Sequence, residues 1–123
     1  MIEDEITEVI LQKAFHVHTA LGPGLLESAY KECLFYDLRQ VGLNVQKEKA
    51  MPLFYKEVQL DLGYRIDLLV ENKVIIEVKT VETFNDVHIA QVLTYMQLSG
   101  CKVGLLLNFK TTSLKKGIKR LVL

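Results

Sequence analysis

The sequence predicts an α/β fold. Three observations carry this prediction. Apolar residues recur every three or four positions before residue 42, two β-rich runs surround a polar turn within residues 65–79, and residues 103–107 form an unbroken apolar run. Helical and strand periods therefore occur in one chain, as an α/β fold requires. With 123 residues and 50% hydrophobic content, we expect one globular domain, 1–123.

Two amphipathic helices are expected in the N-terminal third. The first covers residues 3–21 and ends at Gly22-Pro23-Gly24. The second runs from about Leu25 to Gln40. Its predicted buried stripe consists of Leu26, Ala29, Tyr30, Cys33, Leu34, Leu38 and Val41.

Glu27 lies in the first turn of the second helix, where the helix dipole favours an acid. Lys31 is its ordinary partner at i, i+4. Tyr30 lies on the same side of the helix, so its hydroxyl is a candidate for the same site as Glu27. After this helix, residues 43–62 alternate only loosely around Pro52, and both two strands and one bent edge strand fit this pattern.

Residues 65–79 predict a β-hairpin with a three-residue loop at 71–73. Opposed residues of an antiparallel pair point to the same face, so joining the apolar faces requires paired numbers with an even sum. This register sets Asp67 across from Glu77. The predicted apolar face consists of Ile66, Leu68, Val70, Val74, Ile76 and Val78.

Two adjacent carboxylates repel each other when both are ionised, so Asp67 and Glu77 need a nearby cation. Lys79, Arg65 and a metal ion are the candidates. Carboxylate oxygens are the ligands that hard divalent ions such as Mg²⁺ prefer, and a lysine suits a reaction that develops negative charge. The alternative is a solvated sheet face that carries only an ion pair.

A third helix and two further strands complete the chain. Thr83-Phe84-Asn85-Asp86 has capping-box spacing and predicts a helix that ends at Ser99, before Gly100. Residues 102–109 predict a strand buried on both faces, and residues 118–123 predict an edge strand. The apolar side of this helix is predicted to consist of Val87, Ala90, Leu93 and Leu98. Another side is predicted to be polar, with His88, Gln91 and Tyr95.

Composition narrows the class of protein. The acidic N-terminus and the absence of a long apolar run argue against a signal peptide and a membrane span, so a cytoplasmic protein is expected. Cys33 and Cys101 are expected to be buried thiols. His16 and His18 lie two positions apart and are expected to have structural or surface roles rather than to share a metal.

The net charge is zero, but its distribution is uneven. Residues 1–86 hold all fifteen acidic residues and nine basic ones, whereas residues 87–123 hold only basic ones. A basic C-terminal third could hold a polyanion next to acidic metal ligands. Its members are Lys102, Lys110, Lys115, Lys116, Lys119 and Arg120.

The order of these features along the chain resembles that of the PD-(D/E)XK nuclease-like superfamily. An acid on an early helix is followed by an Asp on one strand, by Glu-x-Lys on the next strand and by a later helix that carries Gln. The segment Gly24-Leu25-Leu26-Glu27-Ser28-Ala29-Tyr30 resembles the GxxExxY family, a compact branch of that superfamily. This resemblance implies a restriction-endonuclease-like α-β-β-β-α-β core with an extra N-terminal helix, in which a mixed central sheet is flanked by helices. Ile66 stands where the name-giving Pro is found, which removes no ligand.

The resemblance also implies roles for individual residues. Asp67, Glu77 and the backbone carbonyl of Val78 would bind Mg²⁺ or Mn²⁺, and Glu27 would add a carboxylate. Lys79 would orient or deprotonate the attacking water, while Gln91 and Tyr95 would hold Lys79 or a phosphate. Nucleic-acid contacts are expected from Lys110, Lys115, Lys116, Lys119 and Arg120.

The function expected on these grounds is metal-dependent hydrolysis of DNA or RNA. One alternative is a non-catalytic nucleic-acid-binding or assembly module that keeps the nuclease-like fold. Another is a protein whose activity appears only with a partner chain, such as one half of a defence system. A homodimer is a further expectation, because twofold symmetry would let two sites cut two strands.

Overall fold

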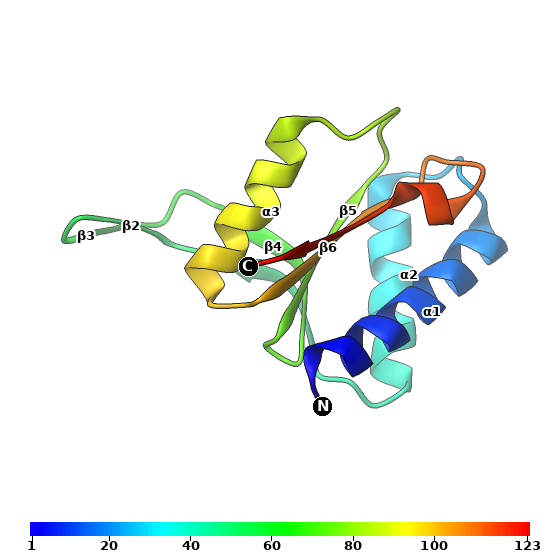
Figure 1. Cartoon of the computed structure of the whole chain (residues 1–123), viewed down its shortest axis with the longest axis horizontal. Helices are drawn as coiled ribbons and strands as arrows, with labels where there is room; N and C mark the ends of the chain where they lie inside the picture. Colours follow the sequence, from blue (N-terminus) through cyan, green and yellow to red (C-terminus); the bar gives the residue numbers. More distant parts are fainter.

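The computed structural model describes residues 1–123 as a five-stranded sheet with helices on both faces (Figure 1). The strand order is β1-β4-β5-β6-β7, in which β5 and β6 pair in parallel and the other neighbours are antiparallel. The predicted mixed α/β architecture is therefore confirmed. The elements are α1 Glu3–Leu21, α2 Glu27–Gln40, β1 Val45–Ala50, β2 Leu53–Tyr55, β3 Val58–Leu60, β4 Arg65–Val70, β5 Val74–Lys79, α3 Asp86–Ser99, β6 Val103–Asn108, the 3₁₀ turn η1 Leu114–Gly117 and β7 Ile118–Val122.

Helices α1 and α2 cover one face of the sheet, and their predicted patterns are largely correct. Helix α1 buries Ile6, Ile10, Ala14 and Val17. Helix α2 buries Tyr30, Leu34 and Leu38, but Cys33 is exposed, as is Leu26 at 78%. The expected burial of Leu26 is wrong because the helix begins at Glu27, which leaves Leu26 as an extended N-cap outside the packed stripe.

Helix α3 covers the opposite face, with a different side buried from the one predicted. Val92, Tyr95 and Met96 are buried, whereas Val87 is 74% exposed. A Cβ at Gly104 of β6 would lie 2.7 Å from Val92, so this glycine lets α3 approach the sheet closely. The N-cap is also two residues later than the predicted Thr83, because the side chain of Asn85 accepts from the amide of His88.

The predicted hairpin register is correct, since Leu68 pairs with Ile76 and Val70 with Val74. The predicted apolar face is wrong at Ile66. Leu68 and Val70 pack toward α1 and α2, but Ile66 belongs to the core under α3. Regular backbone pairing between β4 and β5 stops at Leu68, so the alternation of faces is not kept beyond that residue.

Residues 45–60 contain three strands, where one or two were expected. Strand β1 pairs with β4 at one edge of the sheet, while β2 and β3 form a separate hairpin, which we call the arm. The arm projects from the body of the molecule (Figure 1). Lys56 lies in its turn with a φ of 54°. The arm exposes Phe54 and Tyr55, each at 62%.

Tyr30 ties the α1–α2 connection together instead of reaching the site of Glu27 as expected. It is fully buried, its hydroxyl donates to the carbonyl of Gly22 and accepts from the amide of Leu25 at 3.0 Å, and its ring stacks on Phe109 with centroids 4.6 Å apart. The tyrosine of the G-x-x-E-x-x-Y segment therefore stabilises the connection between α1 and α2 in this chain.

We expect Tyr30→Phe to lower the free energy of unfolding by about 1–3 kcal/mol, because two backbone groups lose their partner. Urea unfolding measures this change. Tyr36→Phe is the matched control, since Tyr36 lies on the same helix, is 62% exposed and has no hydrogen bond through its hydroxyl. Equal stability of both variants would contradict the role of the Tyr30 hydroxyl.

Candidate metal and catalytic site

Two carboxylates connect β4 and β5 where regular backbone pairing ends. The amide of Asp67 donates to Oε2 of Glu77 at 2.7 Å, and the amide of Val78 donates to Oδ2 of Asp67 at 2.9 Å. Each carboxylate thus accepts from the opposite strand in place of a backbone carbonyl. The structure brings the two predicted acids together, as the even-sum register requires.

Burial makes this pair electrostatically costly. Glu77 is 3% exposed, and its pKa is raised to about 8, first by burial and then by the charge of Asp67. Burial also raises the pKa of Asp67, although the Val78 amide and the charges of Lys31 and Lys79 oppose this. Near neutral pH the pair therefore holds a proton when no added cation is present.

Lys79, Gln91 and Tyr95 lie beside the carboxylates on the α3 side. Lys79 Nζ donates to Oε1 of Gln91 at 3.3 Å. The pKa of Tyr95 is raised by burial and then by the charge of Glu77, so its hydroxyl lies in the field of the site. The structure thus brings these three predicted residues to the same end of β5. The amide of Val78 is used by Asp67, and the role of its carbonyl stays a prediction.

Glu27 is exposed at the start of α2, and its charge raises the pKa of Glu77. The chain contains no group of three or more His, Cys, Asp or Glu side chains arranged to hold a metal ion. The converging donors are therefore Asp67 and Glu77. The buried Glu77 and the half-buried Asp67 fit a divalent ion, since their oxygens suit Mg²⁺ and an ion would offset their negative charge.

Lys31 is a neighbour of the site that the sequence pattern did not identify. Its Nζ lies 2.8 Å from Oε1 of Glu48 on β1, not beside Glu27, and its side chain is 14% exposed. Burial acts to lower the pKa of Lys31, but the hydrogen bond that Lys31 donates to Glu48 and the charges of Asp67, Glu48 and Glu32 outweigh it and raise the pKa. Lys31 and Lys79 therefore bring positive charge to Asp67 from two different elements.

Glu48 shows how the chain holds Lys31 in place. It lies inside β1 with a φ of 54°, between the pairs Lys47–Leu68 and Lys49–Ile66, and so directly opposite Asp67. A positive φ is unfavourable for a residue with a side chain. Glu48 and Lys31 lie 19 and 36 positions before Asp67 in the sequence, so only the pairing of β1 with β4 and the position of α2 bring them close to it.

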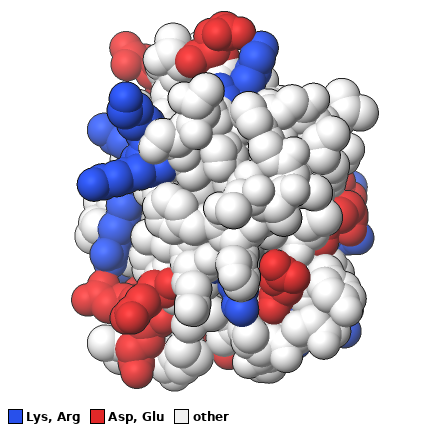
Figure 2. All heavy atoms as spheres, turned by 90° about the vertical axis from the view of Figure 1, so that its right-hand side faces the viewer, with Lys and Arg blue, Asp and Glu red and all other residues white.

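The basic C-terminal third is exposed, and part of it is paired. Lys110 forms an ion pair with Glu82, and Arg120 forms one with Asp4. Four further exposed lysines, Lys102 among them, have no ion-pair partner. On the face beside α1 and α2, basic side chains gather along one margin and the centre carries no charge (Figure 2). The unpaired lysines of the predicted contact set are Lys115, Lys116 and Lys119.

The central sheet, its flanking helices and the paired carboxylates beside a lysine define a restriction-endonuclease-like α/β fold. The family model of the PD-(D/E)XK nuclease superfamily matches residues 4–121, and the chain belongs to this superfamily. The predicted membership at this level is confirmed.

A similar solved structure is the crystal structure of SSO0001, with a TM-score of 0.59 and 17% sequence identity. The match covers 98% of this chain and 59% of that chain, so the protein spans little more than half of the related structure. At this identity the likeness concerns the fold. No curated protein matches the chain. None of its helices is both long and apolar enough to cross a membrane.

Proposed function

We propose that the protein is a metal-dependent phosphodiesterase that hydrolyses DNA or RNA, and that it belongs to the GxxExxY branch as a single domain. The observation that carries this proposal is the pair of carboxylates of Asp67 and Glu77. Each accepts a hydrogen bond from the opposite strand where regular pairing of β4 and β5 ends, and Lys79 lies beside them. The two carboxylates join the strands through their amides, but the burial of their incompletely compensated charge is costly, and this charge suits a cation-assisted reaction at phosphate.

In this proposal, each residue of the site has a separate role in binding the ion or in the reaction. Asp67 and Glu77 bind the ion, with the Val78 carbonyl as a further ligand and Glu27 acting through water. A divalent ion at this point supplies a water of lowered pKa and offsets charge on the phosphate. Lys79 orients the attacking water and stabilises negative charge on the phosphate oxygens, while Gln91 holds the lysine.

Hydrolysis forms a bond between the water oxygen and phosphorus and breaks one ester P–O bond, whose oxygen leaves with a proton. Tyr95, which lies in the field of both acids, helps Gln91 to hold Lys79 or a phosphate. The exposed Lys115, Lys116 and Lys119 supply sequence-independent contacts to the nucleic-acid backbone.

A non-catalytic nucleic-acid-binding or assembly module is the second candidate. The absence of a group of three metal-type side chains favours it, because two carboxylates bind Mg²⁺ more weakly than three. Activity that needs a partner chain, or a homodimer, remains compatible with both candidates.

The test combines two measurements on the same preparation. Calorimetry with Mg²⁺ and Mn²⁺ measures ion binding, and cleavage of labelled single-stranded and duplex DNA and RNA is followed with metal and with excess chelator. The proposal expects saturable binding and cleavage that the chelator abolishes. Nucleic-acid binding without ion binding or cleavage would instead support the second candidate.

We expect Lys31→Met to lower cleavage about tenfold or more, because it removes a cation held beside Asp67. Lys31→Arg should restore part of the rate. Lys47→Met is the matched control, since Lys47 joins β1 to Glu32 of α2 at 2.8 Å but is not among the main charges acting on Asp67. Equal losses in both methionine variants would show that the effect comes from docking of α2.

A further inference from the structure

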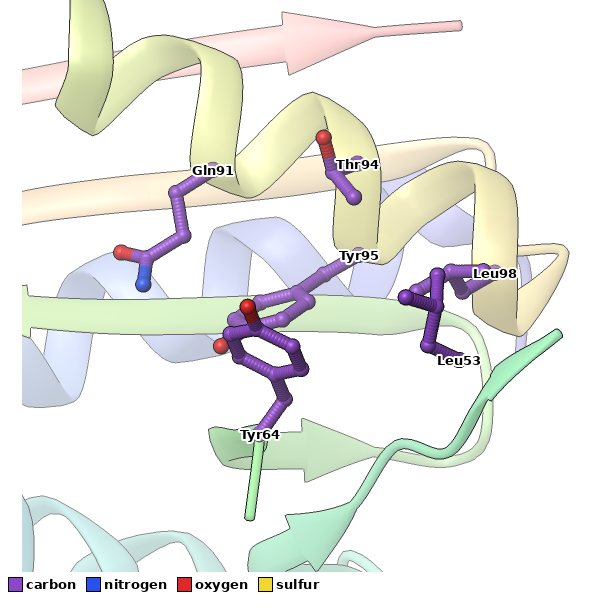
Figure 3. A pocket seen from close by; sticks show the side chains of 6 residues that line it. All are labelled: Leu53, Tyr64, Gln91, Thr94, Tyr95 and Leu98. Carbon is purple, nitrogen blue, oxygen red and sulfur yellow. The ribbon is translucent and has the colours of Figure 1, made fainter. Parts of the chain in front are cut away.

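A pocket of about 250 Å³ lies between α3 and the base of the arm, next to the candidate site (Figure 3). Gln91, Thr94, Tyr95 and Leu98 enter it from α3, and Leu53 and Tyr64 close it from the other side. Pockets for drug-sized ligands measure about 300–1,000 Å³, so this one suits a ligand of one or two rings.

The lining of the pocket suits a flat, uncharged ring that carries a few polar groups. Tyr64 is 46% exposed and presents an aromatic surface, while Leu53 and Leu98 supply apolar walls. The Gln91 amide and the Thr94 hydroxyl are among its uncharged polar groups. No Lys, Arg, Asp or Glu lines the pocket, which disfavours a phosphate as its occupant.

The pocket and the candidate site share two residues. Gln91 lines the pocket and accepts the hydrogen bond of Lys79, and Tyr95 lines it while lying in the field of Glu77 and Asp67. A ring bound in the pocket would therefore belong to a nucleotide beside the phosphate that reacts.

From this arrangement, we propose that the pocket binds an unpaired nucleobase next to the scissile phosphate, and that the substrate is single-stranded nucleic acid or an unpaired stretch of it. This inference rests on the proposed function. A base within a duplex is stacked and paired, so it can enter a side pocket only after leaving the helix. A base in a single strand can stack on a tyrosine without that cost.

The test measures binding without metal, so it does not depend on catalysis. Fluorescence anisotropy in chelator compares a labelled single strand, its duplex and a single strand with abasic sugars throughout. We expect Tyr64→Leu to weaken single-strand binding about 5- to 100-fold, the usual effect of losing one stacked base. Duplex and abasic binding should change less than twofold.

Two further variants make this test specific. Tyr55→Leu is the matched control, because Tyr55 is an exposed tyrosine of the arm outside the pocket; it should leave all three affinities within twofold. Thr94→Phe fills the pocket from an exposed helix position and should reproduce the loss seen with Tyr64→Leu.

The outcomes separate this inference from the proposed function. A single-strand affinity unchanged in both pocket variants would overturn the inference, even if the wild type cuts nucleic acid in a metal-dependent way. Selective loss of single-strand affinity in a protein that never cuts would leave the base pocket standing and overturn the nuclease proposal. A loss shared by Tyr55→Leu would assign binding to the arm instead of the pocket, and would also overturn the inference.

Discussion

Lys79→Ala is expected to lower metal-dependent cleavage about 100- to 1,000-fold, the usual effect of removing one donor that stabilises developing charge. The charge of Lys79 acts on both carboxylates and its Nζ donates to Gln91, and in the proposed mechanism its ammonium group stabilises charge on the reacting phosphate. Single-turnover cleavage with saturating Mg²⁺ measures the loss separately from binding.

Ion binding should survive this change. Asp67 and Glu77 remain in the Lys79→Ala variant, so calorimetry should still detect Mg²⁺. Lys73→Ala is the matched control, because Lys73 lies at the turn of the same hairpin, away from the carboxylates, and its Nζ donates to the carbonyl of Met1. It should cleave at the wild-type rate. Equal traces of activity in wild type and Lys79→Ala would indicate a contaminating nuclease and refute the assignment.

Mg²⁺ affinity is expected to rise about tenfold per pH unit on the acidic side of pH 8 and to level off above it. The pKa of Glu77 is raised to about 8 by burial and by the charge of Asp67, so the ion must displace a proton below that pH. Calorimetry between pH 6 and pH 9 measures this, and two buffers of different ionisation enthalpy report the released proton.

Glu77→Gln is the control for the source of the proton. This variant keeps an oxygen that can accept from the Asp67 amide but loses a charge, so it should bind Mg²⁺ weakly and without this pH dependence. The same ionisation has the opposite effect on the metal-free protein. Its folded state keeps a proton that the unfolded chain has lost, so stability should fall as pH rises from about 4.5 to about 8. If the Mg²⁺ affinity of the wild type does not change on the acidic side of pH 8, ion binding is not coupled to loss of a proton from Glu77.

Much of the site could be predicted from the sequence because strand geometry is local. Alternation with a period of two and a three-residue turn allow one register that joins the apolar sides of β4 and β5, and that register sets Asp67 opposite Glu77. The position of Lys79 two residues later follows from the same rule. The run at 103–107 likewise determined the buried strand β6.

Periodicity was a weaker guide for α3. Its residues are apolar on several sides, so the pattern alone did not select the buried one, and Val87 proved exposed while Tyr95 proved buried. The packing surface of β6, opened by Gly104, decided which side faces the sheet. As a result, Tyr95 belongs to the core, lies in the field of the two acids and lines the pocket.

The sequence by itself determined the order of the three helices and of β4 to β7, the hairpin register and the candidate residues Asp67, Glu77 and Lys79, because these depend on neighbours along one element or across one turn. Only the tertiary structure decided that Lys31 acts on Asp67 and that Tyr64 faces α3 across a pocket. Both relations join elements far apart in the chain, and they depend on how helices dock on a twisted sheet, which no local period encodes.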